Sequence, residues 1–197
     1  MIVLASQSAS RAAMLAAAGV TFDAVPAHVD EDGVTAALVA EQASADQLAD
    51  ALAELKAVKV SRSRPAALVL GSDSVVTTAD GRFLAKPGSR AGAEAQLRDL
   101  SGTKHRLTSA AVMAQAGQPV WRAVAHADLT MRPLSEAFMA DYLDREGSDV
   151  LGCVGCYRLE GLGAQLFTRI DGDQFVIRGL PLLQVLDYLR LRGELLI

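Results

Sequence analysis

The sequence predicts an α/β domain built around a mixed, twisted sheet. Short apolar runs such as Ile2 to Ala5 and Ala66 to Leu70 are typical of buried strands. They alternate with segments in which leucines repeat at helical spacing. The length of 197 residues suits one domain, residues 1–197, which can bury a core without disulfides or a structural metal. We therefore expect a single α/β domain.

Helices are predicted where a Ser or Pro precedes a leucine-rich segment. The predicted helices start at Ser8 or Ser10 and end at Gly19, run from about Thr35 to Ser61, follow Ser89 to Gly102, follow Ser135 to Arg145, and start near Pro181. In the second helix, Leu48, Leu52 and Leu55 share one face. Lys56 and Lys59 lie in its last turns, where cations suit the helix dipole, so a solvated helix end is the structural alternative to a functional role for them.

Strands and turns account for the rest of the chain. Strands are predicted at residues 2–5, 66–70, 105–114 and 120–131, with turns about Asp80-Gly81, Gly117-Gln118-Pro119 and Asp171-Gly172. The segment Gly71-Ser72-Asp73-Ser74 interrupts an apolar run and is expected to form a turn, which places Asp73 at a strand end. An ionised carboxylate against a core is costly without a partner. Asp73 is therefore either a catalytic group or a paired structural carboxylate.

The charge balance limits the partners of this protein. A formal net charge of −4 and a pI near 5.4 argue against nucleic acid or an anionic membrane, so positive charge for a polyanionic substrate must be local. The first residues have a short apolar run without a basic leader, so we expect no signal peptide. No apolar window reaches about 18 residues. We therefore expect a cytoplasmic protein without a membrane partner.

Cys153 and Cys156 form a C-x-x-C pair, which could belong to a redox centre or to half of a zinc site. A redox pair usually opens a helix after a strand, whereas the surrounding glycines and Tyr-Arg-Leu indicate a loop entering a strand. Zinc normally takes four ligands, and the three histidines are scattered along the chain. Buried structural thiols are the better interpretation.

Polar residues gather at the ends of the predicted strands, where open α/β sheets bind ligands. A strand that leads directly into a helix is a common anion site, because backbone N–H groups and the helix dipole point there. The candidate phosphate-binding residues are Ser6, Ser8, Ser10, Arg11, Lys56, Lys86 and Arg106. Glu31 and Asp73 are oxygen ligands of the kind that Mg²⁺ or Mn²⁺ accepts. Lys86 and Arg106 could equally be surface charges, and His105 a hydrogen-bonded structural residue.

An ordered series of short motifs covers nearly the whole chain: LASQSASR, VDE, LKA, GSDSVV, AKP, GTKHRLTSA, CYRLEGLGA and GLPL. Together they resemble the Maf family of nucleotide pyrophosphatases. The resemblance implies an elongated mixed sheet flanked by helices, similar to inosine triphosphatase, with an active cleft between two lobes and often a homodimer. It also implies hydrolysis of a nucleoside triphosphate to the monophosphate and pyrophosphate, with a divalent cation such as Mg²⁺, Mn²⁺ or Co²⁺.

The resemblance also implies roles for particular residues. Asp73 would be the catalytic proton acceptor, Glu31 would support the metal or the water, and Lys86 would take part in catalysis. Glu31 and Asp73 would hold the metal. The residues expected to bind substrate are Ser6, Ser8, Arg11, Lys56, Lys86, His105 and Arg106.

Three departures from the family pattern concern the base of the nucleotide. The family's Pro-Arg-Arg is Ala9-Ser10-Arg11 here, GADT is GSDS, and the usual Gln before a Gly is Glu160. Ser10, Ser74 and Glu160 fall where the family sets base specificity. The GSDS and Glu-Gly forms resemble the branch that acts on 7-methyl-GTP more than the dTTP and UTP branch, although that branch commonly has a bulky residue in place of Ser10. We expect a modified or purine nucleotide.

Two other functions are compatible with parts of the sequence. One is a non-catalytic nucleotide-binding or nucleic-acid-binding regulator of cell division, and the other is a C-x-x-C thiol oxidoreductase. The joint presence of Glu31, Lys56, Asp73 and Lys86 disfavours a pure binding protein, which needs no base beside a metal. The acidic pI disfavours nucleic acid as a partner.

Overall fold

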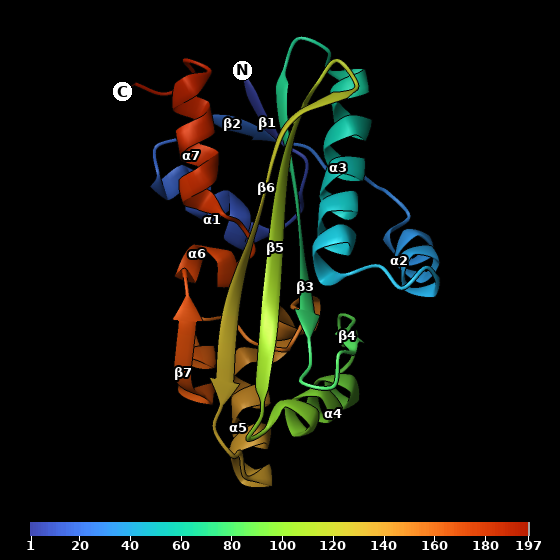
Figure 1. Cartoon of the computed structure of the whole chain (residues 1–197). Helices are drawn as coiled ribbons and strands as arrows, with labels where there is room; N and C mark the ends of the chain where they lie inside the picture. Colours follow the sequence, from blue (N-terminus) through green and yellow to red (C-terminus); the bar gives the residue numbers. More distant parts are fainter. Residues whose placement is uncertain (197) are drawn as a thin grey trace. The chain divides into compact units, whose positions relative to one another are not determined.

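A mixed sheet with helices beside it forms the framework of the computed structural model, which describes residues 1–196 (Figure 1). The strands of this described part are β1 Ile2–Leu4, β2 Phe22–Ala24, β3 Leu68–Thr77, β4 Phe83–Leu84, β5 Lys104–Gln115, β6 Gln118–Met131 and β7 Phe167–Gly172. Their order is β2-β1-β3-β5-β6-β7, with β4 paired to β3. β1 is parallel to β2 and β3, whereas β4 on β3 and β7 on β6 are antiparallel. The predicted α/β class with a mixed sheet is confirmed.

The helices follow their predicted serine caps closely. They are α1 Ala9–Ala17, α2 Glu31–Ala40, α3 Ala45–Ser63, α4 Arg90–Leu100, α5 Glu136–Glu146, α6 Gln174–Ile177 and α7 Leu182–Leu191, with 3₁₀ turns η1 Gly147–Gly152 and η2 Leu162–Leu166. The hydroxyls of Ser8, Ser89 and Ser135 each accept a hydrogen bond from the backbone N–H three residues later. Ser8 rather than Ser10 is therefore the cap of α1. No described helix is long and apolar enough to cross a membrane.

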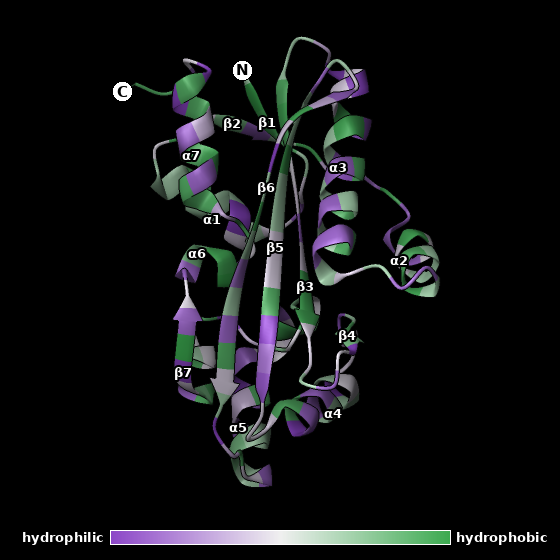
Figure 2. Ribbon diagram, in the orientation of Figure 1, coloured by the Kyte–Doolittle hydropathy of each residue, from purple (hydrophilic) through white to green (hydrophobic). Residues whose placement is uncertain are grey.

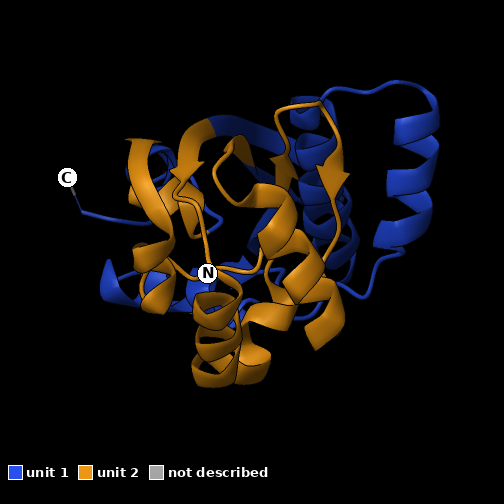
Figure 3. Cartoon of the chain, turned by 90° about the horizontal axis from the view of Figure 1, so that it is seen from below, with its two compact units in different colours: residues 1–74, 109–125, 179–197 blue, residues 75–108, 126–178 orange. Residues whose placement is uncertain are grey.

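The chain divides into two compact units, shown in different colours in Figure 3. Unit 1 comprises residues 1–74, 109–125 and 179–197, and unit 2 comprises residues 75–108 and 126–178. β3, β5 and β6 each contribute residues to both units. The cleft between lobes that the family resemblance implies stays a prediction.

The single long helix predicted from Thr35 to Ser61 is wrong, because α2 and α3 are separate helices. Gln42 lies between them with a φ of 59°, in the left-handed region that ends a helix. Ser44 and Gln47 then form a capping box: the Ser44 hydroxyl accepts from the Gln47 N–H, and the Gln47 side chain accepts from the Ser44 N–H. This Ser-x-x-Gln signature stands in the sequence and marks where α3 begins.

The turn predicted at Gly71 to Ser74 is also wrong, because these residues lie inside β3. Asp73 is therefore in the middle of a strand and not at its end. Side chains alternate along a strand, so Gly71 and Asp73 share the face that α3 covers. A Cβ atom on Gly71 would lie 2.7 Å from the backbone nitrogen of Ala57 and closer still to the carbonyl oxygen of Ala53. Only glycine allows α3 to approach β3 this closely.

Two further expectations near the C-terminal part of the chain are wrong. The hairpin predicted about Asp171-Gly172 is absent, since these residues end β7 and pair with Asp128 and Ala127 of β6. A Cβ atom on Gly172 would lie 2.7 Å from that of Ala127, so this close pairing requires glycine. The Tyr-Arg-Leu segment after Cys156 does not enter a strand directly, because the 3₁₀ turn η2 comes before β7. By contrast, the Asp80-Gly81 hairpin is confirmed by the pairing of Val76 with Leu84.

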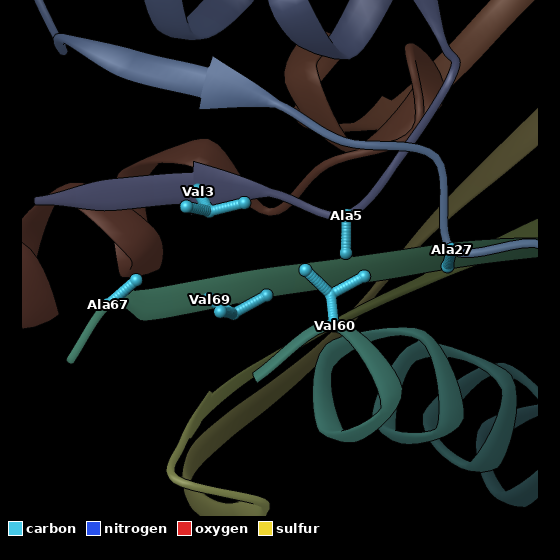
Figure 4. Close-up of a cluster of buried hydrophobic side chains, with 6 residues drawn as sticks. All are labelled: Val3, Ala5, Ala27, Val60, Ala67 and Val69. Carbon is cyan, nitrogen blue, oxygen red and sulfur yellow. The ribbon is translucent and has the colours of Figure 1, made fainter. Parts of the chain in front are cut away.

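Part of the core of unit 1 is a cluster of small apolar side chains between β1, β3 and α3 (Figure 4). Its members are Val3, Ala5, Ala27, Val60, Ala67 and Val69. Hydrophobic and hydrophilic residues alternate along α3, as expected of a helix with one buried face (Figure 2). On another side of unit 1, the Trp121 ring of β6 stacks on Tyr188 of α7, with ring centroids 4.9 Å apart. This stack attaches the last helix to the sheet.

Candidate active site

A buried lysine joins two carboxylates at the contact between α3 and β3. The Lys56 ammonium lies 2.5 Å from Asp73 Oδ1 and 2.9 Å from Glu31 Oε1. The side chains of Lys56 and Asp73 are only 8% and 12% exposed, while that of Glu31 is 36% exposed. Of the two alternatives for Lys56, the structure therefore excludes the solvated helix end, whereas Lys59 is exposed. Lys56 follows Leu48 and Leu52 at intervals of four residues, which is the sequence signal that it shares their buried face.

The ion pairs that Lys56 forms with Asp73 and Glu31 offset the cost of burying these side chains. An ion taken out of water needs an opposite charge and hydrogen bonds to offset its lost hydration. The Glu31, Lys56 and Asp73 group contains two carboxylates and one ammonium. It therefore carries a net negative charge that attracts a further cation or hydrogen-bond donor.

Arg11 of α1 is a second cation whose charge acts on Asp73 and Glu31. Its Nε donates to the Gly179 carbonyl at 2.7 Å, Nη2 donates to Ser74 Oγ at 3.2 Å, and Nη1 to Ser6 Oγ at 3.4 Å. Burial lowers the pKa of the Arg11 guanidinium, and the charges of Asp73 and Glu31 oppose that effect. Arginine stays protonated in proteins, so the guanidinium remains a fixed positive charge.

The connection between β1 and α1 has the form of an anion-binding loop. The Ser6 hydroxyl accepts from the Ser8 N–H at 3.1 Å, and the Ser8 hydroxyl caps α1 by accepting from the Arg11 N–H. The positive end of the helix dipole lies at this cap, beside the Arg11 guanidinium. Ser10 lies within the first turn of the same helix.

Buried hydroxyls hold the surroundings of Arg11 in place. Ser72 Oγ lies 2.8 Å from the Ala110 carbonyl and 2.9 Å from the Gly179 carbonyl, so its one proton is shared between two acceptors, one of which also accepts from Arg11. The hydroxyls of Ser74 and Ser109 are 2.8 Å apart. Sequence reasoning missed Ser109 and Gly179, whose only signal was their place in motifs of the resemblance. Ser72 and Ser74, the two positions where GSDS differs from the GADT form of the family, therefore form hydrogen bonds with other residues of unit 1.

Replacing Ser74 tests whether this network orients Arg11. Ser74→Ala removes one hydrogen bond to a charged group but leaves the bonds to Gly179 and Ser6, so we expect the affinity for inorganic tripolyphosphate to fall about 3–10-fold. Isothermal titration calorimetry measures this change. Ser74→Thr keeps the hydroxyl and should retain the affinity of the native chain. Equal affinities for all three proteins would show that Ser74 does not orient Arg11.

Lys86, His105, Arg106 and Glu160 belong to unit 2. Lys86 is exposed after β4, and Arg106 donates to both carboxylate oxygens of Asp128. Hydrogen bonds from Arg106, supported by Lys104, hold the pKa of the Asp128 carboxyl well below its usual range. Glu160 Oε2 lies 3.6 Å from Arg178 Nε.

His105 is a buried residue of the aromatic core of unit 2. Its Nε2 lies 3.0 Å from the Tyr157 hydroxyl, and its ring packs near those of Tyr157 and Phe167. Burial lowers the pKa of His105 to about 4, so the ring is neutral at neutral pH. These contacts agree with the interpretation of His105 as a hydrogen-bonded structural residue.

Cys153 and Cys156 are free thiols. Burial raises the pKa of Cys156 to about 12 and also raises that of Cys153. The thiolate is the nucleophile in thiol chemistry, and these pKa shifts keep both sulfurs protonated near neutral pH. The structure therefore favours structural thiols over an oxidoreductase.

Glu31 and Asp73 suit a metal ion that is held partly by substrate phosphates better than one that is held by protein side chains alone. Among residues 1–196, no three His, Cys, Asp or Glu side chains form a group that could hold a metal by themselves. Mg²⁺, however, is commonly held by one or two carboxylates together with substrate phosphates. Glu31 and Asp73 provide two such carboxylates on either side of the Lys56 ammonium.

Comparisons with known proteins agree with the motifs. A family model described as "Maf-like protein" matches residues 1–192. A nucleoside triphosphate pyrophosphatase of Sphingopyxis alaskensis is 48% identical, over 98% of this chain and 97% of that protein. One of Caulobacter vibrioides is 50% identical, over 98% of this chain and 96% of that protein. A solved structure of a HAM1 protein from Coxiella burnetii matches with a TM-score of 0.41 and 16% identity, over 66% of this chain and 72% of that chain.

Proposed function

Because the chain belongs to the Maf-like protein family, we propose that it is a nucleoside triphosphate pyrophosphatase, which releases pyrophosphate and leaves the nucleoside monophosphate. The observation that carries the proposal is the ion-paired group of Glu31 and the buried Lys56 and Asp73, in the same unit as Arg11 and the capped start of α1. A protein that only bound nucleotides would need the cations but not two carboxylates beside them.

Different residues of unit 1 have different roles in the proposed hydrolysis. Arg11 and the amides at the start of α1 bind the phosphate chain and offset the charge that moves onto the leaving pyrophosphate. Asp73 accepts the proton of the attacking water. The Lys56 ammonium donates to Asp73 Oδ1 and holds the carboxylate in one orientation. We assign Lys86 to the phosphates as well, as an exposed cation after β4.

A divalent cation completes this proposal. The charges of Arg11 and Lys56 only balance those of Glu31 and Asp73, so a polyanionic substrate calls for further positive charge. Glu31 and Asp73 are the residues that would hold Mg²⁺, Mn²⁺ or Co²⁺, together with phosphate oxygens. When bound, such an ion stabilises negative charge on the phosphate oxygens as a Lewis acid.

The proposal also covers the base of the substrate, the oligomeric state of the enzyme and its location in the cell. We assign base selection to Ser10, Ser74 and Glu160 and propose a modified or purine base, 7-methyl-GTP among the candidates. A carboxylate such as Glu160 can accept the N–H groups of guanine and favours a cationic methylated ring. We further propose a homodimer in the cytoplasm, with a nucleoside triphosphate as the substrate.

A nucleotide panel tests the proposed function. The purified chain is incubated with 7-methyl-GTP, GTP, dTTP, UTP and inosine triphosphate, with Mg²⁺, Mn²⁺ or Co²⁺ in turn, and pyrophosphate is followed. We expect pyrophosphate and monophosphate in equal amounts from at least one nucleotide, and loss of the reaction when EDTA is added. Parallel reactions without protein control for spontaneous hydrolysis. Absence of pyrophosphate with every nucleotide and metal would refute the proposal.

A further inference from the structure

Glu146, the last residue of α5, is a buried carboxylate that the proposed reaction does not use. Its side chain is only 4% exposed, and glutamates are almost never fully buried unless they are paired. The partners that it has come from one segment, residues 158–163, which we call the Glu160 loop. A buried polar group that is paired in this way rigidifies the segment that it binds.

Glu146 contacts the Glu160 loop on both sides of Glu160. Its Oε1 accepts the Leu162 N–H at 2.8 Å, and its Oε2 lies 3.3 Å from Arg158 Nε in an ion pair that lacks hydrogen-bond alignment. Arg158 also pairs with Asp149 of η1. The two contacts of Glu146 therefore lie two residues before and two residues after Glu160.

The glycines of the Glu160 loop show how closely it surrounds the carboxylate. A Cβ atom on Gly161 would lie 2.9 Å from Glu146 Oε1. A Cβ atom on Gly163 would lie 2.5 Å from the carbonyl oxygen and 2.8 Å from the nitrogen of Arg158, because the chain folds back on itself. The Gly161 N–H donates to the Arg158 carbonyl at 3.1 Å and closes this turn. The backbone of the loop is thus built against Glu146.

These contacts hold the backbone on both sides of Glu160. The Glu160 side chain is 32% exposed, and its Oε2 lies 3.6 Å from Arg178 Nε. We propose that Glu146 is a positioning residue that fixes the Glu160 loop and thereby sets the base selectivity of the enzyme. This inference rests on the proposed function, in which Glu160 contacts the base.

Substitution of Glu146 should change selectivity and leave phosphate chemistry alone. In Glu146→Ala both contacts are lost, and we expect the ratio of kcat/KM between the preferred nucleotide and the poorest one to fall about 10-fold. We expect kcat for the preferred nucleotide to change by less than about 3-fold, because Asp73 and Arg11 are untouched. Glu146→Gln keeps an acceptor for the Leu162 N–H and should show a smaller fall.

Two further variants separate positioning from general destabilisation. Glu136→Gln removes an exposed carboxylate from the first turn of the same helix, where its partner is Arg98, and should leave both selectivity and kcat unchanged. Glu160→Gln should lower selectivity directly. The double variant Glu146→Ala/Glu160→Gln should lose no more selectivity than Glu160→Gln alone, since both changes act through one carboxylate.

Hydrogen exchange of the free protein provides a measurement that needs no nucleotide. The amides of residues 158–163 should exchange faster in Glu146→Ala than in the native chain or in Glu136→Gln. Unchanged exchange, or faster exchange with unaltered selectivity in an active enzyme, would overturn the assignment. If the native chain released pyrophosphate from no nucleotide, the proposed function itself would be refuted, which distinguishes that failure from failure of the Glu146 assignment. Glu146→Gln serves for the same measurements if Glu146→Ala does not fold.

Discussion

Asp73→Asn is expected to lower kcat for the best nucleotide about 10²–10⁴-fold, which corresponds to about 3–5 kcal/mol of barrier. The amide has almost the same shape as the carboxylate but cannot accept a proton from water. Lys56 keeps Glu31 as a charged partner at 2.9 Å, so the variant should remain folded. Steady-state pyrophosphate release, measured beside thermal unfolding, gives both quantities.

Asp141→Asn provides the matched control for this substitution. Asp141 is an exposed carboxylate of α5 whose ion-pair partner is Arg145, one turn later, and its removal should change neither activity nor stability appreciably. A folded Asp73→Asn protein that hydrolysed nucleotides at the native rate would show that Asp73 is not the proton acceptor.

Gly71→Ala should have the largest effect on stability. The added Cβ would lie 2.7 Å from the Ala57 nitrogen and 2.9 Å from its Cβ, and closest to the Ala53 carbonyl oxygen. These atoms belong to the α3 backbone or are attached to it directly, so the whole helix must move away from β3. Overpacking of this kind costs about 3 kcal/mol, which lowers the melting temperature of a chain of this length by about 6–12 °C. Activity should fall too, because Lys56 and Asp73 stand on the two elements that are forced apart.

Gly152→Ala separates this effect from the general cost of replacing glycine. A Cβ atom at Gly152 meets nothing within 4 Å, and its backbone is outside the left-handed region. That variant should melt within about 2 °C of the native chain, or slightly above it, since alanine restricts the unfolded state. Equal melting temperatures for Gly71→Ala and the native chain would contradict the close approach of α3 to β3.

Elements whose signals lie within a few residues could be predicted from the sequence. The caps at Ser8, Ser89 and Ser135 bind amides three positions away, and the Asp80-Gly81 turn joins neighbouring strands. The capping box of Ser44 is a local signal of the same kind and marks the break between α2 and α3. The leucine pattern around it predicts one continuous helix instead.

The arrangement of the candidate site depends on partners that local patterns do not show. Asp73 finds its ion pair 17 residues away, Ser72 binds the carbonyl of Gly179 across 107 residues, and Arg11 binds the same carbonyl across 168. These partners allow Gly-Ser-Asp-Ser to continue as a strand, because each polar side chain finds a charge or a hydrogen bond. Without knowledge of them, the physical cost of buried polar groups favoured a turn.

The stack of Trp121 on Tyr188 gives the protein an internal optical probe. Trp121 is the only tryptophan in the sequence and belongs to unit 1, whereas the other tyrosines, Tyr142 and Tyr157, belong to unit 2. Fluorescence excited at the red edge of the indole band therefore reports on unit 1 alone, without labelling. Coincidence of its unfolding curve with that of far-ultraviolet circular dichroism would indicate that the two units melt in one cooperative step.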